Sequence, residues 1–162
     1  MILPDVLQPR LKIVFCGTAA GEHSARVGAY YAGRGNRFYE TLFQVGLTPR
    51  KLAPSEFLLL PTYGIGLTDI AKHTSGADKT LRSAHFDAPS LRHKIEVYAP
   101  TVLAFNGKRS AQACYGQPVS YGIQTDKVGQ TTVFVLPSTS GAARGFWDVR
   151  YWEQAAAYVL GV

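Results

Sequence analysis

Titratable side chains follow a run of small residues near the start of the chain. Residues 17–21 read GTAAG, and Glu22 and His23 come directly after them. Small residues let the backbone approach a ligand closely, and carboxylates and imidazoles are common general acids and bases. The stretch therefore predicts a binding site with two candidates for proton transfer or hydrogen bonding. An ordinary glycine-rich turn is the alternative. The glycines match neither the dinucleotide-binding motif GxGxxG nor the phosphate-binding motif GxxxxGK[ST].

A second polar stretch, PSTSGAAR, lies later in the chain. Ser138, Thr139 and Ser140 offer hydroxyl groups where a strand is expected to turn into a helix, and such turns bind phosphate through hydroxyl and backbone N–H groups. Arg144 follows three small residues, so it could reach into a DNA groove. This stretch predicts a phosphate-binding turn; a solvent-exposed turn with one arginine is the alternative.

Short apolar segments predict the elements that position these stretches. Four segments are rich in branched residues and are typical of buried strands: residues 11–17, 64–69, 101–107 and 131–137. Helical patterns occupy residues 36–45, 89–98, 108–115 and 146–160. Strands that are apolar throughout favour a parallel sheet covered on both faces. We therefore expect a three-layer α/β/α sandwich with a central, mainly parallel four-stranded sheet.

Ligands of such folds bind beyond the carboxyl ends of the strands. This rule points to four segments: residues 18–35, residues 70–87, the start of 108–115, and residues 138–144. Both polar stretches lie in this set, so we expect them to meet in one site.

Composition limits the class of protein. The 162 residues predict a single domain over 1–162, and 46% hydrophobic residues are enough for a buried core. The sequence has neither an apolar run of about 18 residues nor a signal-peptide pattern. Two cysteines are too few for a disulfide framework or an iron–sulfur cluster. We expect an intracellular, cytoplasmic monomer without metal or cofactor.

The charge of the chain favours a polyanionic partner. Seventeen Lys and Arg residues against eleven Asp and Glu residues give a formal net charge of +6. Such a balance favours binding to nucleic acid, although many basic proteins bind none.

Four stretches together resemble the mismatch-specific uracil-DNA glycosylases and the related thymine-DNA glycosylases. They are GTAAGEHSARVGAYYAGRGNRFYETLFQVGL, YGIGLTDIAKHT, VLAFNGK and VLPSTSGAAR. Their order and spacing agree over roughly residues 10–160, and YAGRGNRFYETLF and LPSTS are the most specific parts. The resemblance implies a three-layer α/β fold and excision of uracil, or related damaged bases, from DNA.

The first motif departs from this family. The family has Gly-Ile-Asn-Pro-Gly, whose Asn positions the attacking water, and Ala19 stands at that place here. GTAAGEHS is instead similar to the Gly-x-Ala-Pro-Ala-Ala-His-Gly motif of a thermophile-type uracil glycosylase class, with His23 on its His. That class carries an iron–sulfur cluster and a second motif beginning His-Pro-Ser, whereas Leu136 occupies the His position here. The sequence therefore resembles a divergent class.

The resemblance also implies roles for individual residues. Tyr31 falls where an aromatic ring stacks on the flipped base, with a structural tyrosine as the alternative. Asn36 would contact the sugar, phosphate or base, and it is also a good helix N-cap. The remaining residues are implied to contact either the base or the DNA phosphates and grooves. The residues for the base are Gly17, Thr18, Ala19 and Ser138. The residues for the DNA are Arg34, Lys108, Thr139, Ser140 and Arg144.

Three residues are candidates for catalysis. Glu22 could hold water or oppose positive charge on the sugar, His23 could donate to a uracil oxygen, and Asp69 lies at a strand end that faces the base edge in the resembled family. A carboxylate at that edge would repel uracil carbonyls, so Asp69 would be protonated, accept from N3–H, or face elsewhere.

Three functions follow from these residues. The first is a uracil-DNA glycosylase of base excision repair that lacks the usual Asn. The second is a protein that binds abasic sites or damaged bases with weak or no glycosylase activity, because the water-positioning Asn is missing. The third is an enzyme acting on free nucleosides or nucleotides. In the first two cases the partner is DNA containing uracil or abasic sites.

Overall fold

The computed structural model describes residues 2–76 and 85–162, so the expected segment 70–87 lies partly outside the described residues. The strands are β1 (Ile13–Gly17), β2 (Ile65–Asp69), β3 (Val102–Asn106), β4 (Gly122–Ile123) and β5 (Thr132–Leu136). The α-helices are α1 (Glu22–Val27), α2 (Phe38–Gln44), α3 (Ala88–Tyr98), α4 (Lys108–Tyr115) and α5 (Val149–Leu160). The described residues also include the 3₁₀ segments η1 (Pro54–Tyr63) and η4 (Gly141–Phe146).

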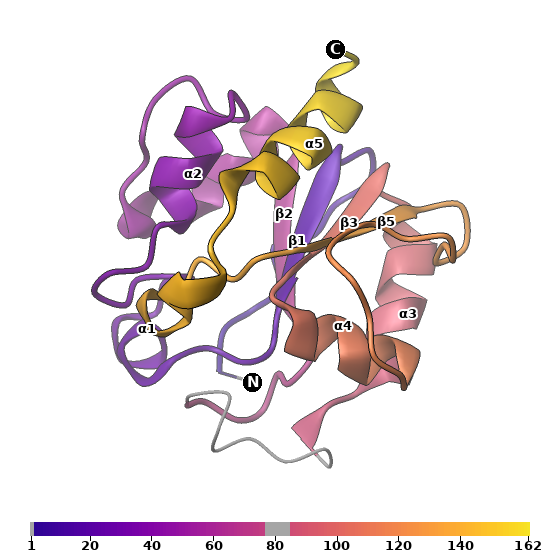
Figure 1. Cartoon of the computed structure of the whole chain (residues 1–162). Coiled ribbons are helices and arrows are strands. Elements are labelled where there is room, and N and C mark those ends of the chain that lie inside the picture. The colour runs from indigo at the N-terminus through magenta and orange to yellow at the C-terminus, as the bar shows by residue number, and fades with distance from the viewer. Residues whose placement is uncertain (1, 77–84) are drawn as a thin grey trace.

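The strands form one sheet in the order β2-β1-β3-β5-β4 (Figure 1). Strands β2, β1, β3 and β5 are parallel, as expected, and β4 pairs antiparallel with β5. The sheet therefore has five strands where the sequence predicted four. Strand β4 has two residues, and a segment of that length is too short to show a hydrophobic pattern.

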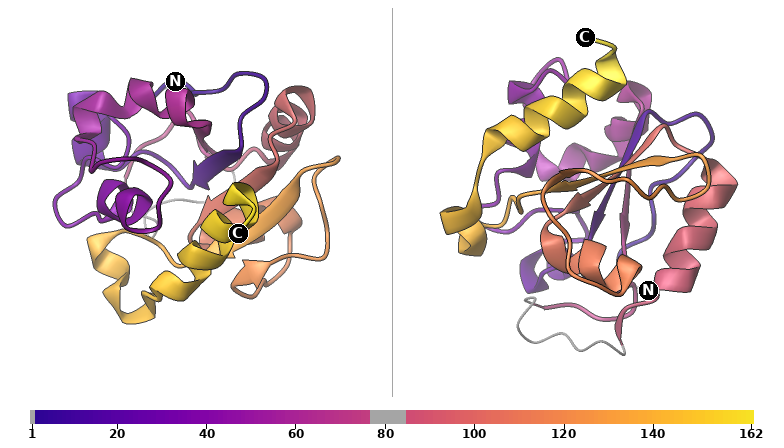
Figure 2. Two further views of the ribbon diagram at one scale, coloured as in Figure 1. Left: turned by 90° about the horizontal axis from the view of Figure 1, so that it is seen from above. Right: turned by 45° about the vertical axis from the view of Figure 1, so that its right-hand side comes forward.

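Alternate residues of each central strand enter two separate cores. Phe15, Leu67 and Ala104 pack with α2, η1 and α5 on one face of the sheet. Cys16 and Phe105 pack with α3 and α4 on the other face. Figure 2 shows the sheet between these two groups of helices. The three-layer α/β/α architecture predicted from the sequence is confirmed.

Several local features differ from the sequence prediction. The last helix, expected over 146–160, begins at Val149, and the 3₁₀ segment η1 was not expected. Residues 22–27 form the short helix α1 inside a segment expected to be a loop. Helix α2 begins at Phe38, two residues after the expected start. The N-cap of this helix is therefore Arg37 and not Asn36 as expected, although the Oδ1 atom of Asn36 accepts the N–H of Phe38 at 3.0 Å.

The parallel register brings three strand ends together. Gly17 at the end of β1 lies opposite Asp69 at the end of β2. On the other side of β1, Cys16 lies opposite Phe105, so Asn106 ends β3 at the same edge. The segments expected to hold the ligand all leave the sheet from this edge.

Candidate active site

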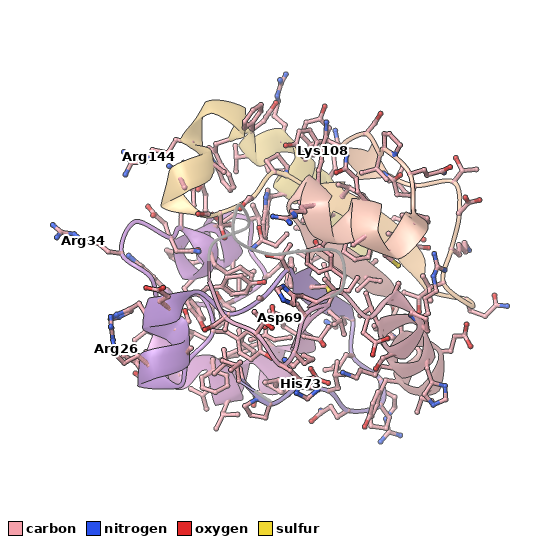
Figure 3. All side chains as sticks on the ribbon, turned by 90° about the horizontal axis from the view of Figure 1, so that it is seen from below. Arg26, Arg34, Asp69, His73, Lys108 and Arg144 are labelled. Atoms are coloured by element: carbon pink, nitrogen blue, oxygen red, sulfur yellow. The ribbon has the colours of Figure 1, made fainter. Side chains whose placement is uncertain are left out.

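A cavity of about 990 Å³ opens at the carboxyl edge of the sheet. Its wall is formed by the segments after β1, β2, β3 and β5, the same four that the sequence singled out. Figure 3 looks into this region from below and places Asp69 near its centre, between the ribbons of α1 and α4. Most of the residues predicted for the site line the cavity: Gly17, Thr18, Ala19, Glu22, Tyr31, Arg34, Asn36, Asp69, Lys108, Ser138, Thr139 and Ser140.

Gly17 lies between two side chains of the cavity wall. A Cβ atom on Gly17 would lie 2.9 Å from Asp69 Oδ1 and 3.2 Å from the Tyr31 hydroxyl. The missing side chain therefore lets a carboxylate and a phenol approach one point above the end of β1. Any side chain larger than hydrogen at position 17 would displace one of these two groups.

Asp69 is a buried acid, 5% exposed, in the wall of the cavity. Burial raises the pKa of its carboxyl from 3.8 to about 6, and the positive charge of Lys72 opposes that rise. Asp69 is therefore mainly ionised at neutral pH, but its carboxyl group takes up a proton at slightly acidic pH. A carboxylate with such a pKa in a cavity is a candidate for hydrogen bonding or charge stabilisation during a reaction.

The same pKa makes a prediction about stability. The folded pKa of Asp69 lies above its unfolded value, so its favourable contribution is present below pH 4 and is lost as pH rises through 6. We expect Asp69→Asn to gain stability relative to wild type over this range, by up to about 3 kcal/mol at pH 7.5. Urea unfolding of both proteins from pH 4 to 7.5 measures the difference, and a pH-independent difference would contradict the assignment.

Tyr31 combines backbone strain with a buried hydroxyl group. Its φ angle is 53°, which is rare for a residue other than glycine. Its ring packs on Phe38 with centroids 4.1 Å apart. Its hydroxyl is buried and makes no hydrogen bond of good geometry within residues 2–76 and 85–162. Burial together with the charge of Asp69 raises its pKa, and the nearby Asn106 side chain opposes that rise. Buried hydroxyl groups without a well-formed hydrogen bond are uncommon in native proteins, so Tyr31 is a candidate functional residue.

Asn106 is a buried pocket residue that the sequence interpretation did not assign. Its amide Nδ2 donates to the hydroxyl of Thr139 at 2.9 Å, and its Oδ1 accepts the Thr139 N–H at 3.0 Å. Thr139 is fully buried, so its side chain orients Asn106 and does not face outward for the expected DNA contact. The position of Asn106 at a strand end, in FNGK, is the signal that could have found it.

The two serines of the second polar stretch shape a turn at the cavity. The hydroxyl of Ser138 accepts the N–H of Ser140 at 3.2 Å, and the hydroxyl of Ser140 accepts the N–H of Ala142 at 3.3 Å. Each hydroxyl keeps a proton that it can donate to a phosphate or base oxygen.

Glu22 and His23 begin helix α1 at the rim of the cavity. Both are exposed, and Glu22 lines the cavity whereas His23 does not. The Nδ1 atom of His23 lies 3.4 Å from the guanidinium of Arg26. Neither residue shares the buried environment of Asp69, so the geometry favours Asp69 among the three predicted catalytic residues.

Basic side chains surround the opening. Lys108 lies 4.4 Å from the ring centroid of Tyr121. Arg34 and Arg144 are exposed, and Figure 3 shows both projecting from the same side of the molecule. Arg144 lies next to Gly35, outside the cavity lining. Phe146, which the sequence interpretation did not single out, is 71% exposed and lines the opening.

Residues 2–76 and 85–162 contain no group of three or more His, Cys, Asp or Glu side chains that could hold a metal ion. No helix in this part of the chain is long and apolar enough to cross a membrane.

Comparison with known proteins agrees with this fold. The family model of the uracil DNA glycosylase superfamily matches residues 4–158. The solution NMR structure of a candidate uracil DNA glycosylase from Methanosarcina acetivorans is similar in fold, with a TM-score of 0.63 and 22% sequence identity. The match covers 98% of this chain and 95% of that one.

Proposed function

The chain belongs to the uracil DNA glycosylase superfamily, and we propose that it hydrolyses the N-glycosidic bond of uracil in DNA and leaves an abasic site. The observation that carries this proposal is Asp69, a buried carboxylate in a cavity whose opening is lined by Arg34 and Lys108. We further propose that the protein works inside the cell as a monomer, without metal or cofactor.

The cavity suits a base that has left the DNA duplex. A glycosylase reaches the bond at C1′ by extruding the nucleotide, which costs a few kcal/mol of stacking and pairing. The ring of Tyr31 lines the cavity and is proposed to stack on the extruded base. Such stacking stabilises the extruded state by about 1–3 kcal/mol. A uracil opposite guanine is weakly paired and costs less to extrude, so we propose that U·G mismatches are preferred to U·A pairs.

Asp69 is proposed to supply the acceptor that Ala19 cannot provide. Bond cleavage develops positive charge on the sugar and negative charge on the departing base. Of the arrangements left open by the sequence, the pKa of about 6 favours an ionised Asp69 at neutral pH. Its carboxylate would accept a hydrogen bond from the base N–H or from the attacking water and would oppose the positive charge. Asn36 and Ser138 are proposed to donate to base or phosphate oxygens.

The proposed activity is tested by the release of free uracil. Oligonucleotides with one uracil opposite guanine, opposite adenine and in a single strand are incubated with excess protein. The proposal expects free uracil and an abasic site, fastest from the U·G duplex. Intact glycosidic bonds in all three substrates would contradict it.

A second function is favoured by one observation. Ala19 replaces the asparagine that positions water in the resembled family, which suits a protein that binds damaged bases or abasic sites without cutting. That function predicts saturable binding to abasic DNA together with no release of uracil.

Two substitutions of Tyr31 distinguish the role of its ring from the role of its hydroxyl group. Tyr31→Ala should slow single-turnover uracil release by roughly tenfold to a hundredfold, the equivalent of about 1–3 kcal/mol of stacking. Tyr31→Phe should keep the stacking and raise the free energy of unfolding by about 1–3 kcal/mol, because it removes a buried hydroxyl without a well-formed hydrogen bond. Unchanged excision by Tyr31→Ala would place the ring away from the base.

Arg144→Ala is expected to affect product retention. Arg144 is exposed on η4 beside the opening, where its side chain could enter the gap left by an extruded nucleotide. We expect faster dissociation from abasic DNA in the variant, with a smaller change in the single-turnover rate. Fluorescence-detected dissociation measures this, with Arg150→Ala as a control arginine that pairs with Asp148. Equal dissociation rates for Arg144→Ala and wild type would rule out this role.

A further inference from the structure

We propose that Lys72, held by Asp5, positions Asp69 and sets the protonation state of its carboxyl group. The proposal rests on the catalytic role of Asp69 proposed above. It assigns a function to the N-terminal segment of the chain, which lies outside the motifs recognised in the sequence.

Lys72 is a buried cation behind the cavity, with its side chain 8% exposed. Its Nζ atom lies 3.7 Å from Asp69 Oδ2 and 3.2 Å from Asp5 Oδ1. It also donates to the hydroxyl of Tyr30 at 2.9 Å. Lys72 itself does not line the cavity, so it acts on a ligand through Asp69.

The atoms of Asp69 show how this contact orients the carboxylate. Its Oδ2 atom faces Lys72, whereas its Oδ1 atom lies beside Gly17 and Tyr31 at the cavity wall. Attraction to Lys72 therefore holds one oxygen inward and leaves the other for a ligand. A buried carboxylate without this cation would be both less fixed and harder to ionise.

Asp5 comes from the N-terminal segment and completes the cluster. This segment runs beside the outer strand β2, where Val6 and Leu67 form a bridge, and the N–H of Ile2 donates to the carbonyl of Lys72. Asp5 also accepts the hydroxyl proton of Thr68 at 2.7 Å and pairs with Lys94 at 2.7 Å. Lys72 is thus shared between two carboxylates.

The charges around Asp69 predict opposite effects for its two neighbours. The charged groups near it are the cations Lys72 and Lys94, which lower its pKa, and the anion Asp5, which raises it. The other titratable groups close by are Cys16, Tyr30 and Tyr31, whose own pKa values burial raises, so all three are neutral near pH 7. Removing Lys72 should therefore raise the pKa of Asp69, and removing the charge of Asp5 should lower it.

The test measures the Asp69 carboxyl directly. Carbon-13 NMR of protein labelled at aspartate carboxyl carbons follows its titration in wild type, Lys72→Met, Lys72→Arg and Asp5→Asn, with Asp69→Asn assigning the signal. We expect Lys72→Met to raise the pKa of Asp69 by about one pH unit or more. Lys72→Arg should stay close to wild type, and Asp5→Asn should lower the pKa. Arg50→Met, which breaks an exposed pair with Glu56, is the matched control.

A parallel measurement is the pH dependence of single-turnover uracil release. The pH at which the rate is half its maximum should move up in Lys72→Met and down in Asp5→Asn, with Lys72→Arg restoring the wild-type profile. A purely structural role would lower rates without moving the profile in opposite directions. If Lys72→Met does not fold, Lys94→Met replaces it and should move the pKa in the same direction by less.

The outcomes separate this proposal from the proposed function. Equal Asp69 pKa values in all variants, or shifts of one sign, would overturn the role of Lys72 and Asp5 even if uracil is released. Opposite pKa shifts without any uracil release would support the cluster and contradict the proposed glycosylase activity.

Discussion

Replacement of Asp69 by asparagine should slow single-turnover uracil release by about 10²–10⁴-fold. Asparagine keeps the shape of the side chain but removes the negative charge, which is proposed to accept a hydrogen bond and oppose positive charge on the sugar. Asp69 is buried in the cavity wall. Water therefore screens this charge little, and removing the charge should lower the rate strongly. Rapid-quench measurement of uracil release with excess enzyme gives the rate.

Two variants of the first polar stretch serve as controls. The sequence alone favoured Glu22 and His23 over Asp69 as the groups that compensate for the missing asparagine, but both are exposed and His23 does not line the cavity. We now expect Glu22→Gln and His23→Ala to have smaller effects than Asp69→Asn. Full activity of Asp69→Asn together with a large loss in either other variant would reverse the assignment.

Gly17→Ala should lower the same rate by about 100-fold. The added Cβ would come within 2.9 Å of Asp69 Oδ1 and 3.2 Å of the Tyr31 hydroxyl, so the carboxylate must move. Displacement of a catalytic group by about 1 Å can cost 10²-fold. The φ angle of Gly17 is not in the left-handed region, so the backbone accepts alanine and the effect should be confined to the cavity.

Gly21→Ala provides the matched control. Gly21 belongs to the same stretch and lines the same cavity, but a Cβ there would meet nothing within 4 Å. Its excision rate should remain within a few-fold of wild type. Equal rates for Gly17→Ala and wild type would show that the reaction does not depend on the exact position of the Asp69 carboxylate beside Gly17.

The sequence was sufficient to predict the layers of the fold but not its edges or short helices. The four long strands are continuous apolar segments, and such segments are distinctive because both faces of a parallel sheet are covered. Strand β4 and helix α1 have two and six residues. Elements this short form through tertiary contacts and leave little periodic signal.

The candidate site was predictable where a residue follows a strand. Asp69 and the segment around Gly17 were found because parallel strand ends meet at one edge of the sheet. The contribution of Lys72 and Asp5 could not be found this way, since they are 67 residues apart (72 − 5) and meet only through the folded chain. The burial of Thr139 likewise depends on its pairing with Asn106 across two strands.

The most direct test of the proposed function follows both products from one substrate. A duplex with a single U·G mismatch and carbon-14 in the uracil is mixed with excess wild-type protein, and Asp69→Asn is run alongside. We predict free uracil and an equal amount of abasic strand with wild type, and release at least about 100-fold slower with the variant although it still binds the duplex. Stable binding of the duplex by wild-type protein with no release of labelled uracil would contradict the glycosylase function and favour a damage-binding protein.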